Sequence, residues 1–288
     1  LLISTHQNQV TSSGYETQAS GKVAIIYGQA VLSELSELTE PDVVIEGSGP
    51  LDGTGKSFKT GDVDGDGRID ILVGSPFGSS NSGRVDVFQG QVTPMSGAYS
   101  SEVATITLEG NSGSSFGYAL STGDLNDDGI AEIIVGAPLD DWGFDDAGSL
   151  SVYTGGPTIF EGSPAASSRF HGEFDDTQLG HGIHAGADLN GDGFGDLVVG
   201  SLFTWKGLVT KGGRVYGMHG PHTDWTPTAS IADVPIQVFG AASKDYLGRS
   251  NWAGDINGDG KAELFMGTGF SNTTRTFDSG SVVMFWGK

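Results

Sequence analysis

Four nine-residue segments place oxygen-bearing side chains at alternate positions along the chain. We number the positions of each segment 1 to 9. Positions 1, 3 and 5 are Asp or Asn in every copy, and position 9 is always Asp or Glu. Alternate spacing in a curled loop directs such oxygens toward one centre, where they can coordinate a cation. The segments, called loops 1 to 4 below, are Asp62–Asp70 (DVDGDGRID), Asp124–Glu132 (DLNDDGIAE), Asp188–Asp196 (DLNGDGFGD) and Asp255–Glu263 (DINGDGKAE).

Each loop is predicted to supply five ligands. The side chains at positions 1, 3, 5 and 9 bind directly, and the varied residue at position 7 offers its backbone carbonyl. Position 6 is glycine in every loop, which permits the sharp turn around an ion. The candidate ligands are Asp62, Asp64, Asp66, Arg68 and Asp70 in loop 1; Asp124, Asn126, Asp128, Ile130 and Glu132 in loop 2; Asp188, Asn190, Asp192, Phe194 and Asp196 in loop 3; and Asp255, Asn257, Asp259, Lys261 and Glu263 in loop 4.

Calcium is the ion that this donor set predicts. The spacing follows the first half of an EF-hand loop, except that the closing acid stands at position 9 and an apolar run follows it. Calcium takes six to eight oxygens in irregular geometry, magnesium prefers a stricter octahedron, and zinc prefers His or Cys, which the loops lack. We therefore expect about four calcium ions, each crosslinking its turn and favouring the folded state.

The composition fits this hypothesis and excludes other functions. The 288 residues carry 36 acidic and 14 basic side chains, for a net charge of −22, which disfavours nucleic acid as a partner. There is no cysteine, so disulfides and thiolate metal sites are excluded. No apolar run reaches the roughly 18 residues that a membrane span needs. The 48 glycines predict a fold with many tight turns.

Short strands surround each loop. The loops begin 62, 64 and 67 residues apart, and an apolar run follows each one: Ile71–Gly74, Ile133–Gly136, Leu197–Gly200 and Leu264–Gly267. A second series of glycine-bounded runs reads GKVAIIYG from Gly21, GRVDVFQG from Gly83, GSLSVYTG from Gly148, GRVYGMHG from Gly213 and GSVVMFWG from Gly280. A third series starts at Val43, Ile106 and Ile236, with a variant at Ser168. β-Branched and aromatic runs of this kind are typical of strands.

The repeat predicts an all-β fold, a β-propeller of four-stranded blades with the calcium loops between strands. A β-solenoid needs a shorter period, and a separate domain in each unit needs its own core. The expected units are a partial one at about 1–47, then 48–110, 111–172, 173–240 and 241–288. Together they form a single domain over 1–288, or part of one in a longer polypeptide.

Phe116-Gly117, loop 2 and Gly136-Ala137-Pro138 together resemble an FG-GAP repeat. This repeat builds the seven-bladed propeller of integrin α-subunits and of bacterial integrin-like proteins. The resemblance covers nearly the whole chain and implies about 4.5 to 5 blades of a seven-bladed ring. Gly74-Ser75-Pro76 is similar to the GAP element, whereas Gly200-Ser201-Leu202 departs from it. The absence of cysteine favours a bacterial surface protein over an animal integrin.

The resemblance also implies an extracellular, secreted or cell-surface role in adhesion or protein–protein assembly, without catalysis. Two alternatives stay open: a propeller domain of a larger secreted hydrolase with a phospholipase D-like parent, and a glycan-binding, lectin-like propeller. We see no catalytic motif, and His181 and His184 lack further ligands for a metal. The candidate contacts to a protein or glycan partner are the loop aromatics Trp142, Phe144 and Trp205. Other domains or subunits could complete the ring.

Overall fold

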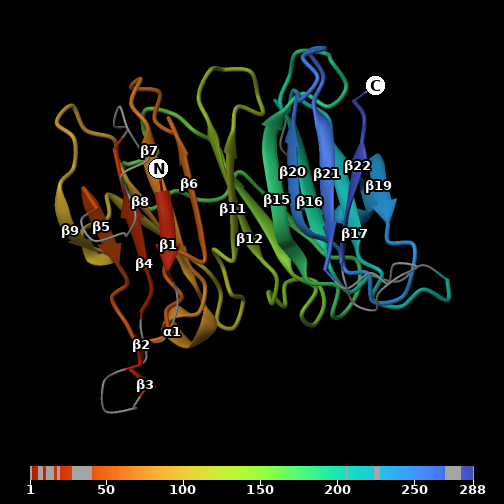
Figure 1. Cartoon of the computed structure of the whole chain (residues 1–288), viewed down its shortest axis with the longest axis horizontal. Coiled ribbons are helices and arrows are strands. Elements are labelled where there is room, and N and C mark those ends of the chain that lie inside the picture. The colour runs from red at the N-terminus through yellow and green to blue at the C-terminus, as the bar shows by residue number, and fades with distance from the viewer. Residues whose placement is uncertain are drawn as a thin grey trace.

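The computed structural model consists of short β-sheets that stand side by side (Figure 1). It describes residues 2–5, 9–10, 16–17, 20–27, 41–204, 207–223, 228–269 and 280–287, and all structural statements below concern these residues. Of the residues singled out in the sequence, Trp205 lies outside them. Within the described part of the chain, no helix is long and apolar enough to cross a membrane.

Five sheets follow one another along the chain, each an antiparallel meander, and most of their strands coincide with the apolar runs noted in the sequence. Sheet 1 contains β1 (Leu2–Thr5), β4 (Lys22–Ile25) and β5 (Val43–Glu46); sheet 2 contains β6 (Ser57–Gly61), β7 (Asp70–Ser75), β8 (Arg84–Phe88) and β10 (Ile106–Glu109); sheet 3 contains β11 (Ala119–Gly123), β12 (Glu132–Ala137), β13 (Ser149–Tyr153) and β14 (Ser168–His171); sheet 4 contains β15 (Leu179–Ala187), β16 (Asp196–Ser201), β17 (Arg214–Met218) and β19 (Ile236–Phe239); and sheet 5 contains β20 (Leu247–Gly254), β21 (Glu263–Thr268) and β22 (Ser281–Phe285). The remaining elements are the pair β2 (Gln9–Val10) and β3 (Glu16–Thr17), the one-turn helix α1 (Gly78–Asn81), and two 3₁₀ turns at Ser101–Val103 and Ile231–Asp233.

Two further strands cross from one sheet to the preceding one. β9 (Gly97–Ser100) lies in the connection between β8 and β10, yet it pairs in parallel with β5 of sheet 1. β18 (Thr228–Ser230) lies in the corresponding connection of sheet 4 and pairs in parallel with β14 of sheet 3. These strands cover outer edges that would otherwise present unpaired backbone groups. Units 2 and 4 therefore each add one extra strand to the preceding sheet, which the four-strand prediction does not include.

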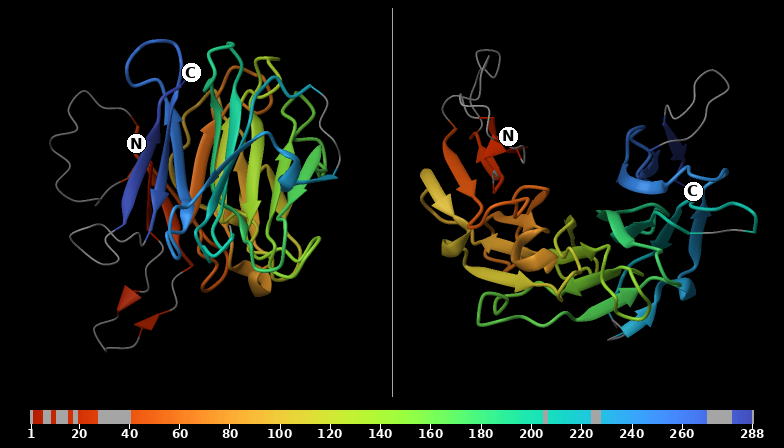
Figure 2. Two further views of the ribbon diagram at one scale, coloured as in Figure 1. Left: turned by 90° about the vertical axis from the view of Figure 1, so that its right-hand side faces the viewer. Right: turned by 90° about the horizontal axis from the view of Figure 1, so that it is seen from below.

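The sheets are arranged in an arc, seen from below in the right panel of Figure 2. Their first strands contact one another in the order β6, β11, β15 and β20, and they lie on the concave side. Parallel bridges connect successive sheets at the start of these strands: Gly21 with Thr54, Gly83 with Phe116, Gly148 with Leu179, and Gly213 with Leu247. Thr54 departs from the Phe or Leu of the other copies, but it occupies the equivalent place, with its hydroxyl 2.8 Å from that of Ser75.

The apolar core lies between neighbouring sheets rather than within each one. Successive strand residues point to opposite faces, so Ile133 on β12 packs toward sheet 2 and Ile134 packs toward sheet 4. On the sheet 4 side, Ile134 joins a cluster that includes Leu197 and the fully buried Tyr216. Sheet 3 thus buries apolar residues against a neighbouring sheet on each of its two faces.

Candidate metal centres

Each loop joins the first strand of a sheet to the second. Loop 1 runs from β6 to β7, loop 2 from β11 to β12, loop 3 from β15 to β16, and loop 4 from β20 to β21. In all four loops position 9 is the first residue of the second strand (Asp70, Glu132, Asp196 and Glu263). The apolar run behind each loop therefore anchors the closing carboxylate in a sheet.

Backbone N–H groups curl each loop around its own side chains. The position 1 carboxylate accepts from the N–H of position 4 at 2.6–2.8 Å and from that of position 6 at 2.8–2.9 Å in every copy. Position 6 is a glycine with φ between +82° and +93°, a conformation that a side chain disfavours. Positions 3 and 5 each accept from the N–H two residues further on, so their oxygens turn to the inside of the loop.

The position 9 carboxylate is buried in every loop, at 0 or 1% exposure. One of its oxygens accepts from the backbone N–H of position 2 at 2.7–3.0 Å, which closes the loop across its base. In loop 3 the same carboxylate also lies 3.1 Å from Nδ1 of His219. Burying a carboxylate is unfavourable unless charge or hydrogen bonds compensate it.

Burial changes the acidity of two of these groups. It raises the pKa of Asp70, and it raises the pKa of Glu132 to about 7. Hydrogen bonds from Leu125 and Gly155 oppose the shift at Glu132, while the charges of Asp128 and Asp124 add to it. A bound cation would relieve this, because it favours the ionised form of every carboxylate around it.

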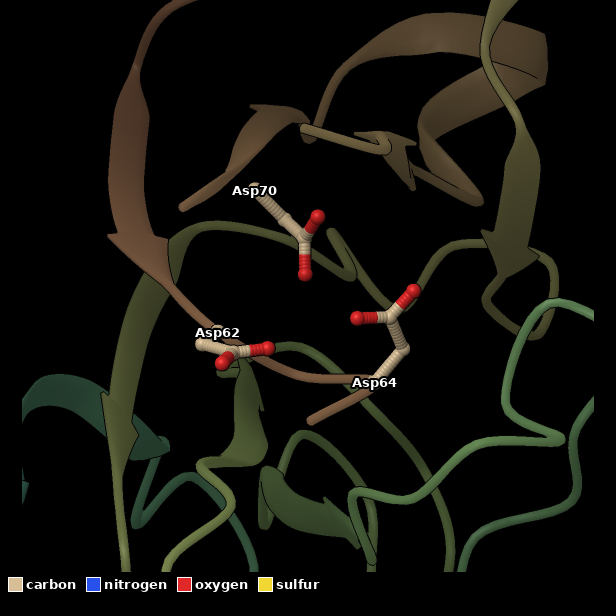
Figure 3. Close-up of side chains that lie close together, drawn as sticks. All are labelled: Asp62, Asp64 and Asp70. Carbon is tan, nitrogen blue, oxygen red and sulfur yellow. The ribbon is translucent and has the colours of Figure 1, made fainter. Parts of the chain in front are cut away.

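Loop 1 gathers three carboxylates most closely. Ligand oxygens of Asp62, Asp64 and Asp70 all lie within 4.8 Å of one another, and Figure 3 shows the three side chains converging. The fourth acid, Asp66, forms an ion pair with Arg68 at position 7. Loops 2 to 4 have Asn at position 3 instead of a third convergent acid. These all-oxygen sets could hold a hard cation such as Ca²⁺ or Mg²⁺.

In sheets 2 to 4, the glycine two residues after the third strand also belongs to the site. Gly90 and Gly220 donate their N–H groups to the position 9 carboxylates of loops 1 and 3, at 2.7 and 2.9 Å. A Cβ atom at Gly90, Gly155 or Gly220 would lie 2.5–2.6 Å from the carbonyl oxygen of position 8. The sequence indicates these glycines only as strand boundaries, although their recurrence is a signal of the close approach.

Neighbouring loops are also bonded to one another. The N–H of Ala131 in loop 2 donates to the carbonyl of Asp62 in loop 1 at 2.9 Å. The N–H of Ala262 in loop 4 donates to the carbonyl of Asp188 in loop 3 at 2.6 Å. Loops 1 and 2 are therefore hydrogen-bonded as one pair, and loops 3 and 4 as another.

The remaining candidates lie elsewhere. The Trp142 ring packs against His171 at 5.2 Å between centroids, and the Arg169 guanidinium lies 4.6 Å from its centre. This packing accounts for Trp142 without a partner. Phe144 is 41% exposed, so it is available for contact. Partner contact by Trp142, Phe144 and Trp205 stays a prediction.

Comparison with known proteins identifies the class. The FG-GAP repeat family matches residues 54–88, 116–153 and 179–218, which lie in sheets 2, 3 and 4. The chain carries FG-GAP repeats, and its sheets are blades of a β-propeller. The family model does not match sheet 5, but loop 4 and its strands have the same arrangement.

Proteins similar to this chain include integrin α-subunits. The chain is 32% identical to integrin alpha-7 of Rattus norvegicus over 170 residues, which is 56% of this chain and 14% of the relative. It is 30% identical to integrin alpha-PS5 of Drosophila melanogaster over 203 residues, 67% of this chain and 19% of the relative. With integrin alpha pat-2 of Caenorhabditis elegans it shares 28% identity over 236 residues, 74% of this chain and 18% of the relative. The chain thus spans less than a fifth of each. Its bacterial origin stays a prediction.

Proposed function

We propose that loops 1 to 4 each bind one calcium ion, and that the ions stiffen an extracellular propeller module for adhesion or protein–protein assembly. The buried carboxylate at position 9 carries the proposal, because four such groups recur at the same place with a curled set of oxygens in front of them. Calcium suits this set better than magnesium, since calcium takes more oxygen ligands and accepts a less regular geometry.

The proposed ligands are those of the sequence analysis: side-chain oxygens at positions 1, 3, 5 and 9, and the carbonyl of position 7. When bound, calcium would supply positive charge to a group of carboxylates that otherwise repel one another. The chain's own contribution is to hold the oxygens inward through the N–H groups of positions 2, 4 and 6.

The similarity to other proteins supports the proposed role as an adhesion or assembly module. The relatives are integrin α-subunits, and the fold offers rigid blades with loops at both ends. We propose that the five sheets act as one domain, on the cell surface or secreted, and that it binds its partner without catalysing a reaction. The exposed Phe144 is a candidate contact.

A metal count tests the ligand assignment in a single loop. Native mass spectrometry in calcium should show four ions on the wild-type protein and three on Asp128→Ala, which removes the position 5 ligand of loop 2. Asp127→Asn is the matched control, because Asp127 is exposed at position 4 and its φ of +66° suits Asn. A wild-type protein without calcium, or equal counts in the two variants, contradicts the proposal.

A further inference from the structure

The concave side of the arc contains a pocket of about 370 Å³, which we call the inner pocket. It lies over the beginnings of the first strands of four sheets, at the ends away from the metal loops. Its lining includes Lys56, Lys59, Tyr118, His181, Arg249 and Asn251. Residues from four successive repeats thus meet at one place.

The charge of the inner pocket is opposite to that of the protein. Lys56, Lys59 and Arg249 line it, and of the residues that the structure describes no Asp or Glu does so. The whole chain has 36 acidic side chains against 14 basic ones, so a purely basic pocket stands out from its surroundings. Placing like charges around one cavity is unfavourable in the absence of a counter-charge.

The two lysines differ in ion pairing from three arginines of the sheets. Arg84, Arg169 and Arg214 each form an ion pair with a carboxylate. For Lys56 and Lys59 the structure records no ion pair with any carboxylate of the described residues. The Lys56 ammonium instead lies 4.3 Å from the centre of the Tyr118 ring. Its charge therefore remains available to a ligand in the pocket.

The pKa of His181 is lowered by its burial in the pocket and by the nearby positive charges. Its ring packs edge-on against Tyr118 at 4.7 Å, and its Nε2 lies 3.0 Å from Oε1 of Gln178. Burial lowers the pKa of His181 to about 3, and the charges of Arg249 and Lys56 add to the effect. The histidine is neutral at physiological pH, so the lysines and the arginine alone provide the positive charge.

The size of the cavity indicates what it holds. A second pocket of about 370 Å³, lined by Lys59, Thr60, Thr122 and His184 among others, continues along the same strands. A water molecule occupies about 30 Å³ of liquid, so an inorganic anion would fill little of this space. Ligand pockets of about 300 Å³ and above hold larger groups. An extended segment with several carboxylates matches both the volume and the spread of charge.

We propose that the inner pocket binds an acidic peptide segment of a partner protein, with its carboxylates held by Lys56, Lys59 and Arg249. The acidic metal loops at the other end of the sheets would repel such a segment. The segment would therefore enter from the pocket end of the sheets. The proposal concerns a different face from the calcium sites, and it stands or falls separately from them.

Fluorescence polarisation with fluorescein-labelled hexaglutamate tests the pocket on the calcium-loaded protein. We expect saturable binding at low ionic strength that weakens as salt is added. The double variant Lys56→Gln/Lys59→Gln and the single variant Arg249→Gln should each lose at least tenfold in affinity. The control Lys244→Gln removes one positive charge, as Arg249→Gln does, but at an exposed turn residue outside the pocket, and it should bind as the wild type does.

Three outcomes overturn the proposal. The first is wild-type protein without saturable binding. The second is a set of pocket variants that keep the wild-type melting temperature and calcium count but bind hexaglutamate undiminished. The third is displacement of the peptide by inorganic sulfate at an equal concentration, because this would assign the pocket to a small oxyanion rather than to a peptide segment.

Discussion

Two kinds of residue shape each metal loop from opposite sides. The buried carboxylate at position 9 lies inside the loop, and the glycine two residues after the third strand lies outside it, next to the carbonyl of position 8. Gly155 illustrates the second kind, since a Cβ atom there would lie 2.5 Å from the carbonyl oxygen of Ala131. Gly129, at position 6, has φ of +83° but open space around it.

Replacing each of these two glycines with alanine should lower the free energy of unfolding by different amounts. Gly129→Ala should destabilise the protein by about 1–2 kcal/mol, the usual cost of placing a side chain in the left-handed region. Gly155→Ala should cost more and should also weaken calcium binding in loop 2, because the clash displaces the backbone next to Glu132. Urea unfolding and calcium titration measure both effects. Equal losses in the two variants would contradict the role assigned to Gly155.

At the residue scale, much of the site could be predicted from the sequence. Types and spacing alone indicate the ligands at positions 1, 3, 5 and 9, because oxygens at alternate positions of a tight loop converge on one centre. The contributions of Gly90, Gly155 and Gly220 could not be inferred, since they depend on a strand that follows the loop by some 20 residues and returns beside it.

At the scale of elements, position 2 closes each loop through its backbone N–H, and in loop 2 its side chain also packs in the core. Leu125 in loop 2 is fully buried in the cluster between sheets 3 and 4, while its N–H holds Glu132. Ile256 occupies the same position in loop 4 but is 55% exposed. The backbone role is common to both residues, and only the side-chain environment differs.

This pair allows a matched test. Leu125→Ala should lower the free energy of unfolding by about 2–5 kcal/mol, as for a large-to-small change in a packed core. Ile256→Ala should change it by less than about 1 kcal/mol, because little apolar surface is lost from the core. Equilibrium unfolding in urea with excess calcium gives both values. A small effect at Leu125 would show that the loop is not anchored by packing.

The element boundaries follow from the sequence better than the strand pairing does. Apolar runs predict the second, third and fourth strands of the four-stranded meanders, and the structure confirms them, whereas the first strands have no such run. The strands β9 and β18 are not predicted, since their partners β5 and β14 belong to the preceding unit. Segments such as Gly97–Ser100 lack an apolar pattern, so only the neighbouring edge selects them as strands.

At the scale of the whole molecule, acid should unfold the protein partly through the concave side. His181 has a pKa of about 3 in the folded state, against an ordinary value of 6.5. Between these two pKa values the unfolded chain binds a proton at His181 that the folded protein does not bind. Stability present above pH 6.5 is therefore lost as the pH falls toward 3.

A histidine replacement measures this contribution. Between pH 7 and pH 4.5, wild-type protein should lose about 2.5 kcal/mol more stability than His181→Gln, because the variant has no histidine to protonate at this position. Comparing the two pH values cancels the packing change caused by the replacement itself. Urea unfolding at both values decides the matter, and identical pH dependence would contradict a buried neutral histidine.

Calcium binding is the central claim, because it involves the ligand residues, the turns between strands, and the hydrogen-bonded loop pairs 1–2 and 3–4. The most direct measurement is thermal unfolding of the same protein in excess calcium and in excess EGTA. A hundredfold excess over the dissociation constant stabilises by about 2.7 kcal/mol for each site, so four sites predict a melting temperature more than about ten degrees higher in calcium. Readdition of calcium should restore it, and magnesium at the same concentration should not. Superimposable melting curves in calcium and EGTA would contradict the claim.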